Sequence, residues 1–336
     1  MFGKMMNRYY YGKSGKGDYT TEDLPQTRWA LFWEMLRVRF SALFRLNLMY
    51  MVAWLPAIIV IGRGLMMAYT GLVNVGELQV QAEAGEIAME VFTEANATLG
   101  EAFKAILMQT LILLVPAIAI TGPFTAGISY VTRNWARDEH AFIWSDYWDA
   151  VKGNWKQGLL TSVITGFVPL LMYVCITFYG QMASDNVLFI IPQVLVIIMS
   201  LLWLCGLMYI YPQMVTYSIN YKGLVRNSLI MVIGRLPMTV GLKLLSLVPT
   251  LIAVAVGLLT PYAVYAAMVL GLYYILLGYA LSRFVAASYA NAVFDRYINI
   301  NIEGAQIGRG LYVESDDDEE EEEQAEKLED PSAPEA

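Results

Sequence analysis

Six apolar stretches, each about as long as a membrane is thick, constrain the fold of this chain more than any other feature. A helix needs roughly 20 mostly apolar residues to cross a bilayer, and lipid leaves no water to satisfy open backbone groups. The stretches are residues 46–72, 105–130, 158–179, 187–211, 238–259 and 262–281. They predict an all-α, multi-pass transmembrane helical bundle with six spans arranged as three hairpins.

The composition agrees with a membrane protein and reduces the kinds of catalytic and metal site that the chain could form. The chain is 57% hydrophobic and 15% charged, whereas globular chains carry about 25% charged residues. Cys175 and Cys205 both lie in apolar runs, and His140 is the only histidine. A disulfide framework, a His-rich metal site and a Ser-His-Asp triad are therefore not expected. We expect no catalytic residue, cofactor, metal or nucleic-acid partner, and a membrane enzyme is the least favoured class.

The distribution of Lys and Arg predicts the orientation of the spans, because short cytoplasmic loops carry an excess of these residues. The N-terminal residues 1–45, the loops 131–157 and 212–237 and the exit of the sixth span are rich in Lys and Arg, whereas the alternate loops are acidic or nearly uncharged. An even number of spans agrees with this bias. Both termini are thus predicted to be cytoplasmic, with the membrane domain of residues 46–296 in a bacterial plasma membrane.

Three segments outside the spans have patterns of their own. Residues 28–45 space their aromatic and apolar side chains as an interfacial helix on the inner leaflet would. In the extracytoplasmic insertion, residues 73–104, the pattern predicts an acidic amphipathic helix. The cytoplasmic C-terminal tail, residues 297–336, is acidic from residue 314, and the eight consecutive acids of residues 316–323 repel one another, which favours disorder.

The segment that follows the second span contains the densest cluster of unusual residues. A Gly-Pro step comes first, then two arginines with acidic neighbours, then an aromatic-rich stretch that ends in Asn-Trp-Lys-Gln. The candidate interaction or structural residues are Gly122, Pro123, Arg133, Arg137, Glu139, His140, Asp146, Asn154, Trp155 and Lys156.

Together with Ala126, Gly127 and Gln157, this motif resembles the YesL-like integral membrane proteins of Gram-positive bacteria. A fainter likeness extends over residues 39–296. The family is biochemically uncharacterised, and its members are often encoded beside sugar importers and polysaccharide-degrading enzymes. The resemblance therefore implies a membrane fold and a link to carbohydrate utilisation rather than a reaction. One departure is the acidic insertion, which separates Leu55-Pro56 from Gly122-Pro123.

The residues themselves allow several interpretations of this segment. Its aromatic rings favour the headgroup level, where its arginines and lysines would reach lipid phosphates. Asp138, Glu139 and Asp146 would instead pair with the arginines and hold the shape of the loop. A docking surface for a cytoplasmic partner and a ligand site are the other interpretations. The aromatic residues are Trp135, Trp144, Tyr147, Trp148 and Trp155, and the basic residues are Arg133, Arg137, Lys152 and Lys156.

Two functional hypotheses follow. The first is a non-catalytic accessory or scaffold protein linked to carbohydrate uptake or utilisation, with the lipid bilayer and a sugar importer or another protein as partners. The alternative is a sugar-related small-molecule transporter or permease component. A weak internal repeat, residues 154–169 and 220–237, and the prolines in the spans favour the alternative. Arg63 and Lys243 are the only charges within the proposed spans, which disfavours proton-coupled transport.

Overall fold

The structure is a computed structural model that describes residues 24–312, and expectations for the N-terminal 23 residues and for the acidic run lie outside this range. Between residues 24 and 312 the chain forms helices and no strand. The elements are α2 (Arg28–Glu83), α3 (Met89–Trp135), α4 (Ser145–Ala183), the 3-10 turn η2 (Val187–Phe189), α5 (Ile190–Thr216), α6 (Tyr221–Gly234), α7 (Leu236–Leu259), α8 (Ala263–Tyr273), the π turn η3 (Tyr274–Gly278), α9 (Tyr279–Tyr297) and the 3-10 turn η4 (Asn299–Asn301).

Six helical segments of the described chain are long and apolar enough to cross a membrane: α2, α3, α4, η2 with α5, α7, and α8 through η4. This confirms the prediction of a multi-pass, all-helical membrane protein. Large apolar side chains along these segments are exposed, such as Ile59, Leu201 and Leu251. Exposed apolar side chains of this kind suit contact with lipid rather than with water.

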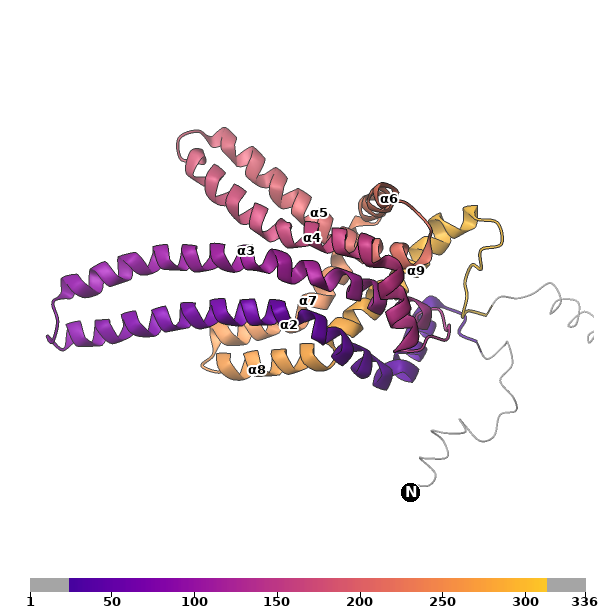
Figure 1. The fold of residues 1–336 in the computed structure, drawn as a ribbon, viewed down its shortest axis with the longest axis horizontal. Coiled ribbons are helices and arrows are strands. Elements are labelled where there is room, and N and C mark those ends of the chain that lie inside the picture. The colour runs from indigo at the N-terminus through magenta and orange to yellow at the C-terminus, as the bar shows by residue number, and fades with distance from the viewer. Residues whose placement is uncertain (1–23, 313–336) are drawn as a thin grey trace, which may run out of the picture.

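The helices splay from a common end of the molecule (Figure 1). We call this end the base; it contains the link 136–144, α6, the C-terminal part of α9 and the segment 302–312. The opposite ends are three tips, residues 84–88, 184–189 and 260–262, at which α2 meets α3, α4 meets α5 and α7 meets α8. The described chain both begins and ends at the base (Figure 1).

The expected interfacial helix is not a separate element. Residues 28–45 are the first turns of α2, which continues without a break to Glu83 and contains Pro56. The side of this segment that includes Leu31, Met35 and Leu43 is buried in the core, while Trp29 and Trp33 remain exposed. The apolar side chains that suggested contact with the inner leaflet therefore include several that pack against other helices.

The acidic insertion is largely helical, and its two helical parts continue the neighbouring spans. Residues 73–83 extend α2 and residues 89–104 extend α3, so the two spans continue as one long hairpin that turns at residues 84–88. Gly85 makes this turn with a φ of +75°, a left-handed conformation that suits glycine. An amphipathic pattern of period 3.6 predicts a helix but does not show whether that helix is separate from its neighbours.

A buried asparagine stabilises the one π turn among the described helices. The Asn47 side chain donates to the carbonyl oxygens of Tyr274 and Ile275, at 2.9 and 2.7 Å, and accepts from the Ala280 amide at 2.8 Å. A π turn leaves backbone groups out of the regular α-helical pattern, and in lipid such groups need another partner. The fully buried Asn47 supplies this partner from α2.

The hydrophobic core lies toward the base. Its largest cluster joins α2, α3, α4 and α9 through buried side chains such as Leu46, Tyr50, Trp135, Tyr147 and Phe284. One smaller cluster joins α5, α6 and α9, and another joins α3, α5 and α6. The base is therefore the packed part of the molecule, and it positions the residues of the candidate motif.

Candidate functional site

Glu139 is the centre of an ion-pair cluster in the base. Its carboxylate lies 2.8 Å from Arg133 Nη1, 3.2 Å from Arg137 Nε and 3.3 Å from Arg309 Nε. Arg133, Arg137 and Glu139 are each less than a fifth exposed, whereas Arg309 is half-exposed. The two predicted arginines thus contact an acidic neighbour inside the protein, which agrees with the loop-folding interpretation and not with contact to lipid phosphates.

Asp295 near the end of α9 organises a second set of polar contacts. Its carboxylate pairs with Arg28 at 2.5 Å, and it accepts hydrogen bonds from the Asn299 side chain at 2.5 Å and from the Gly308 amide at 3.1 Å. The Asp295 side chain is 6% exposed, so this pairing is almost entirely removed from solvent. It joins the start of α2 to the end of α9 and to the segment 302–312.

The segment 302–312 packs closely on the link after α3. A Cβ atom on Gly310 would lie 2.9 Å from the Arg137 carbonyl oxygen, and the φ of Gly310 is +81°. Arg137 donates to the Gln306 carbonyl at 3.2 Å, and the Tyr312 amide donates to the Pro25 carbonyl at 3.1 Å. Both ends of the described chain are therefore attached to the ion-pair cluster.

The Gly122-Pro123 step lies where α3 crosses α4. A Cβ atom on Gly122 would lie 2.0 Å from the Gly158 carbonyl oxygen, so the two backbones are in direct contact. Ser162 Oγ donates to the Ala119 carbonyl across the same crossing at 2.6 Å. Close backbone contact at small residues is a common way to pack membrane helices. Gly122 therefore acts through packing in this structure.

His140 and Asp146 have local contacts. The His140 ring lies edge-on to Phe142, with 4.5 Å between ring centroids. Asp146 accepts from the Phe142 amide at 2.9 Å and from Ser145 Oγ at 3.1 Å, so it stabilises the turn at the start of α4. Within residues 24–312 no group of three His, Cys, Asp or Glu side chains is placed to hold a metal ion.

The aromatic residues of the motif divide into a buried and an exposed set. Trp135 and Tyr147 are each 1% exposed, so these two rings pack inside the protein and do not contact its surroundings. Trp135 Nε1 donates to the Ala141 carbonyl at 3.2 Å, and the Arg39 guanidinium lies 5.9 Å from its ring centroid. Trp144 and Trp155 are 68% and 49% exposed and remain available at the surface.

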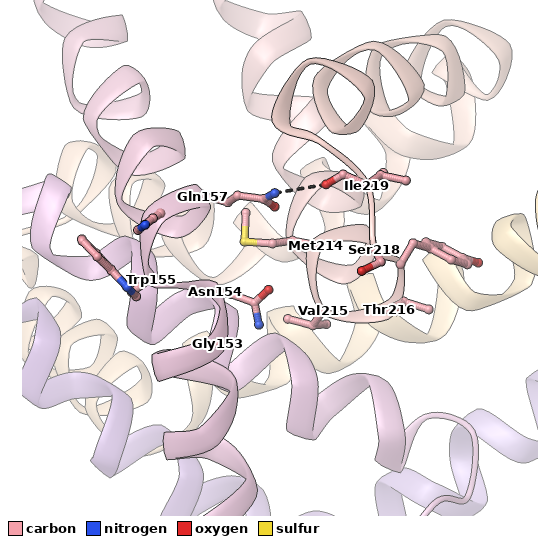
Figure 2. Close-up of a pocket in the computed structure, with 11 residues that line it drawn as sticks. Gly153, Asn154, Trp155, Gln157, Met214, Val215, Thr216, Ser218 and Ile219 are labelled. Atoms are coloured by element: carbon pink, nitrogen blue, oxygen red, sulfur yellow. Dashed lines mark hydrogen bonds between the residues drawn. The ribbon is translucent and has the colours of Figure 1, made fainter.

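The Asn-Trp-Lys-Gln run lines an open pocket in the base (Figure 2). The pocket has a volume of about 760 Å³ and lies between the first turns of α4 and the link that joins α5 to α6. Figure 2 shows the Asn154 amide facing Val215 across this space, whereas the Trp155 ring lies on the other side of α4. The lining residues are Gly153, Asn154, Trp155, Lys156, Gln157, Met214, Val215, Thr216, Tyr217, Ser218 and Ile219.

Two hydrogen bonds fix the shape of this pocket. Gln157 Nε2 donates to the Ile219 carbonyl at 3.1 Å (Figure 2), which holds the link against α4. Tyr217 Oη donates to Asn299 Oδ1 at 2.6 Å, and Asn299 in turn binds Asp295. Burial, together with the nearby Asp295 carboxylate, raises the pKa of Tyr217 to about 12. The Tyr217 hydroxyl therefore stays protonated at neutral pH and connects the pocket to the polar contacts of Asp295.

The loops in the structure are shorter than those predicted from the sequence. Of residues 131–157, only 136–144 lie outside a helix, and residues 212–237 include all of α6. Five residues of these contacts carry no sequence motif that predicted them as site residues: Arg28, Tyr217, Asp295, Asn299 and Arg309. Asp295 had a detectable signal, because it is the one carboxylate in an otherwise uncharged or basic stretch, residues 279–298.

One comparison with known proteins gives a match. The model of a family described as "Protein of unknown function, DUF624" matches residues 43–176. This range contains all ten candidate residues of the motif, from Gly122 to Lys156, and is consistent with the resemblance drawn from them. No curated protein and no solved structure matches the chain. The chain is thus similar, over residues 43–176, to an uncharacterised family.

Proposed function

We propose that this protein is a non-catalytic accessory or scaffold protein of a bacterial plasma membrane, linked to carbohydrate uptake or utilisation. Its base would face the cytoplasm and dock a subunit of a sugar importer. The observation that carries the proposal is the division of the motif: Arg133, Arg137 and Glu139 contact one another inside the base, whereas Asn154 and Lys156 line an open pocket. The pocket is the part of the motif that a partner can reach.

The chemistry of the pocket supports docking of a polar protein segment. Its walls combine amide and hydroxyl groups with the carbonyl end of α5. The last carbonyl groups of a helix have no partner within the helix and accept hydrogen bonds from other groups. A partner segment with both donors and acceptors would satisfy these groups, and the interior ion pairs would hold the pocket in shape.

Affinity purification of the tagged protein from its native membrane tests this function. The pocket variant Asn154→Ala/Lys156→Ala is compared with the wild type and with Lys104→Ala, a control whose side chain is exposed far from the base. Subunits of a sugar importer should co-purify with the wild type and the control and be lost from the pocket variant. Recovery of no such subunit at normal protein abundance would overturn the proposal.

The proposed orientation has its own test. In a variant without Cys175 and Cys205, a cysteine at Ser184 lies at a tip and a cysteine at Ser145 lies at the base, and both positions are exposed. A membrane-impermeant maleimide added to intact cells should label Ser184→Cys and leave Ser145→Cys unlabelled until the membrane is opened. The reverse pattern would contradict a cytoplasmic base.

A transporter or permease component is the second candidate. The π turn η3 in the helix that follows α8 favours it, because π turns within helices are frequent at functional sites. The stacked rings of Trp54 and Tyr279, 5.0 Å apart, lie beside this turn. Uptake of a sugar into vesicles that contain the purified protein would support this candidate, and uptake equal to that of empty vesicles would reject it.

A further inference from the structure

A second pocket lies in the base, between α6 and the end of α9, and we call it the α6–α9 pocket. It has a volume of about 500 Å³, within the range of pockets that bind small ligands. Among the described residues that line it, Arg235 is the one that carries a charge. Most of the others are apolar, and they include Ile230, Met231, Val293, Ile298 and Ile302. The pocket therefore combines an apolar wall with a single cation.

The α6–α9 pocket lies where a membrane span begins. Arg235 directly precedes α7, the fifth of the apolar helices that are long enough to cross a membrane. The side chains of Ile230, at the end of α6, and Leu236, at the start of α7, are exposed, as suits contact with lipid. Tyr297, which lines the pocket, is half-exposed, and rings of this kind favour the headgroup level. These positions put the pocket at the level of the lipid headgroups beside the base.

Two arginines at this pocket share one aromatic ring. The guanidinium carbons of Arg235 and Arg296 lie 5.3 and 5.9 Å from the centroid of the Tyr297 ring. The Arg235 side chain is partly exposed, and the Arg296 side chain is exposed. Within residues 24–312, neither guanidinium group donates a hydrogen bond to another residue or lies within ion-pair distance of a carboxylate. Contact with a ring leaves their positive charge in place, so it is available to an anion.

The acidic residues near these arginines do not neutralise them. Asp295 precedes Arg296 in sequence, but it is 6% exposed and pairs with Arg28. Glu303 follows the lining residue Ile302, is exposed, and has no cation within ion-pair distance among the described residues. An anion at the pocket would thus supply a charge that the described part of the chain does not. At a membrane surface, the anions within reach of basic side chains include lipid headgroups.

We propose that the α6–α9 pocket binds one anionic phospholipid from the leaflet beside the base. The headgroup phosphate accepts charge-assisted hydrogen bonds from Arg235 and Arg296, whose planar guanidinium groups match phosphate geometry. An acyl chain lies against the apolar wall that Ile230 and Met231 form on α6 and Ile302 forms after α9. A lipid whose headgroup also carries an ammonium group would bring a further cation to the two arginines and bind more weakly. This binding goes beyond the proposed function, because it requires no partner protein.

Native mass spectrometry of the purified full chain in detergent tests this binding. Phosphatidylglycerol and phosphatidylcholine with identical acyl chains are added separately. We expect one phosphatidylglycerol molecule to bind about tenfold or more tightly than phosphatidylcholine, because the choline ammonium would face two cations. Equal affinity for the two lipids would overturn the proposal.

Variants of the two arginines show whether the lipid binds at this pocket. Arg235→Gln/Arg296→Gln should lower the affinity for phosphatidylglycerol by about tenfold or more, because charge-assisted hydrogen bonds are lost. The control Lys152→Gln, an exposed cation elsewhere in the base, should retain the affinity of the wild type. If the double variant does not fold, Arg296→Gln decides at an exposed position, with an expected loss of about two- to fivefold. Unchanged affinity in the folded variants would show binding at other surfaces and overturn the proposal.

The headgroup without its chains separates a lipid from a free phosphodiester. Glycerophosphoglycerol has the same phosphate but no acyl chain to bury, so it should bind about tenfold or more weakly than phosphatidylglycerol. Equal binding of the two would overturn the assignment of a lipid and indicate a soluble phosphodiester as the ligand. No importer subunit is present in these measurements, so their result is independent of the co-purification test.

Discussion

Arg133 and Glu139 form a 2.8 Å ion pair inside the base, across the end of α3. The same carboxylate contacts Arg137 in the following link and Arg309 in the segment that precedes the tail. One acidic side chain thus connects three parts of the chain, one of which lies some 170 residues away in sequence. Removal of one partner from a buried ion pair is more damaging than replacement of the whole pair, because it leaves an uncompensated charge.

The substitution Glu139→Gln should therefore destabilise the base. It preserves the shape of the side chain but leaves three arginines without their shared counter-charge, and we expect the free energy of unfolding to fall by about 3 kcal/mol. Equilibrium unfolding in mixed detergent micelles measures this change. Asp149→Asn, which affects an exposed pair with Lys152, is the matched control and should cost about 0 to 1 kcal/mol. Equal losses in both variants would contradict the assigned role of Glu139.

The substitution Gly122→Ala should disrupt the crossing of α3 and α4. The added methyl group would lie 2.0 Å from the Gly158 carbonyl oxygen, so the helices must separate. We expect a loss of about 2 kcal/mol or more in the free energy of unfolding. The control Gly100→Ala lies in the same helix with no atom near its new Cβ, and it should be neutral or stabilising by up to about 1 kcal/mol. A thermal unfolding comparison in one detergent separates the two outcomes.

Loss of the Asn47 side chain should weaken the contact between α2 and the π turn. Asn47→Ala removes three hydrogen bonds to backbone groups that lie away from water. A buried polar group left without a partner costs about 1 to 3 kcal/mol, and we expect a destabilisation in this range or above. Hydrogen exchange at Ala280 should accelerate in the same variant. The exposed Asn96→Ala serves as the control, and unchanged exchange at Ala280 would refute the role given to Asn47.

Tyr217→Phe should remove a tyrosine whose hydroxyl loses its proton at a higher pH than that of an ordinary tyrosine. The pKa of Tyr217 in the folded protein is about 12, above the ordinary tyrosine value of about 10. Because the pKa of Tyr217 is higher in the folded than in the unfolded protein, its protonated hydroxyl contributes to the stability of the fold. This contribution is complete below about pH 10 and is lost as the pH rises through the folded-state pKa. The difference in tyrosinate absorbance between the wild type and the variant should therefore appear near pH 12. A difference that appears near pH 10 would show that the hydroxyl is not buried.

The membrane architecture could be predicted from the sequence because hydropathy is a local property. A stretch such as residues 187–211 is long and apolar enough to span lipid whatever its neighbours are. The arginines of the motif and their acidic neighbours were also detectable, since Arg133 and Glu139 are only six residues apart. The sequence by itself therefore determined the class of protein, the spans and part of the candidate site.

Only the tertiary structure decided which polar groups meet. Arg309 contacts Glu139, and Arg28 contacts Asp295, over separations of roughly 170 and 267 residues. No periodicity or spacing encodes such pairs, because they depend on where the helix ends converge. The same reason explains residues 28–45, whose amphipathic pattern was detectable but whose burial in the core was not. Local pattern determined the helices, and long-range packing determined which of their faces became the interior and which lined the pocket.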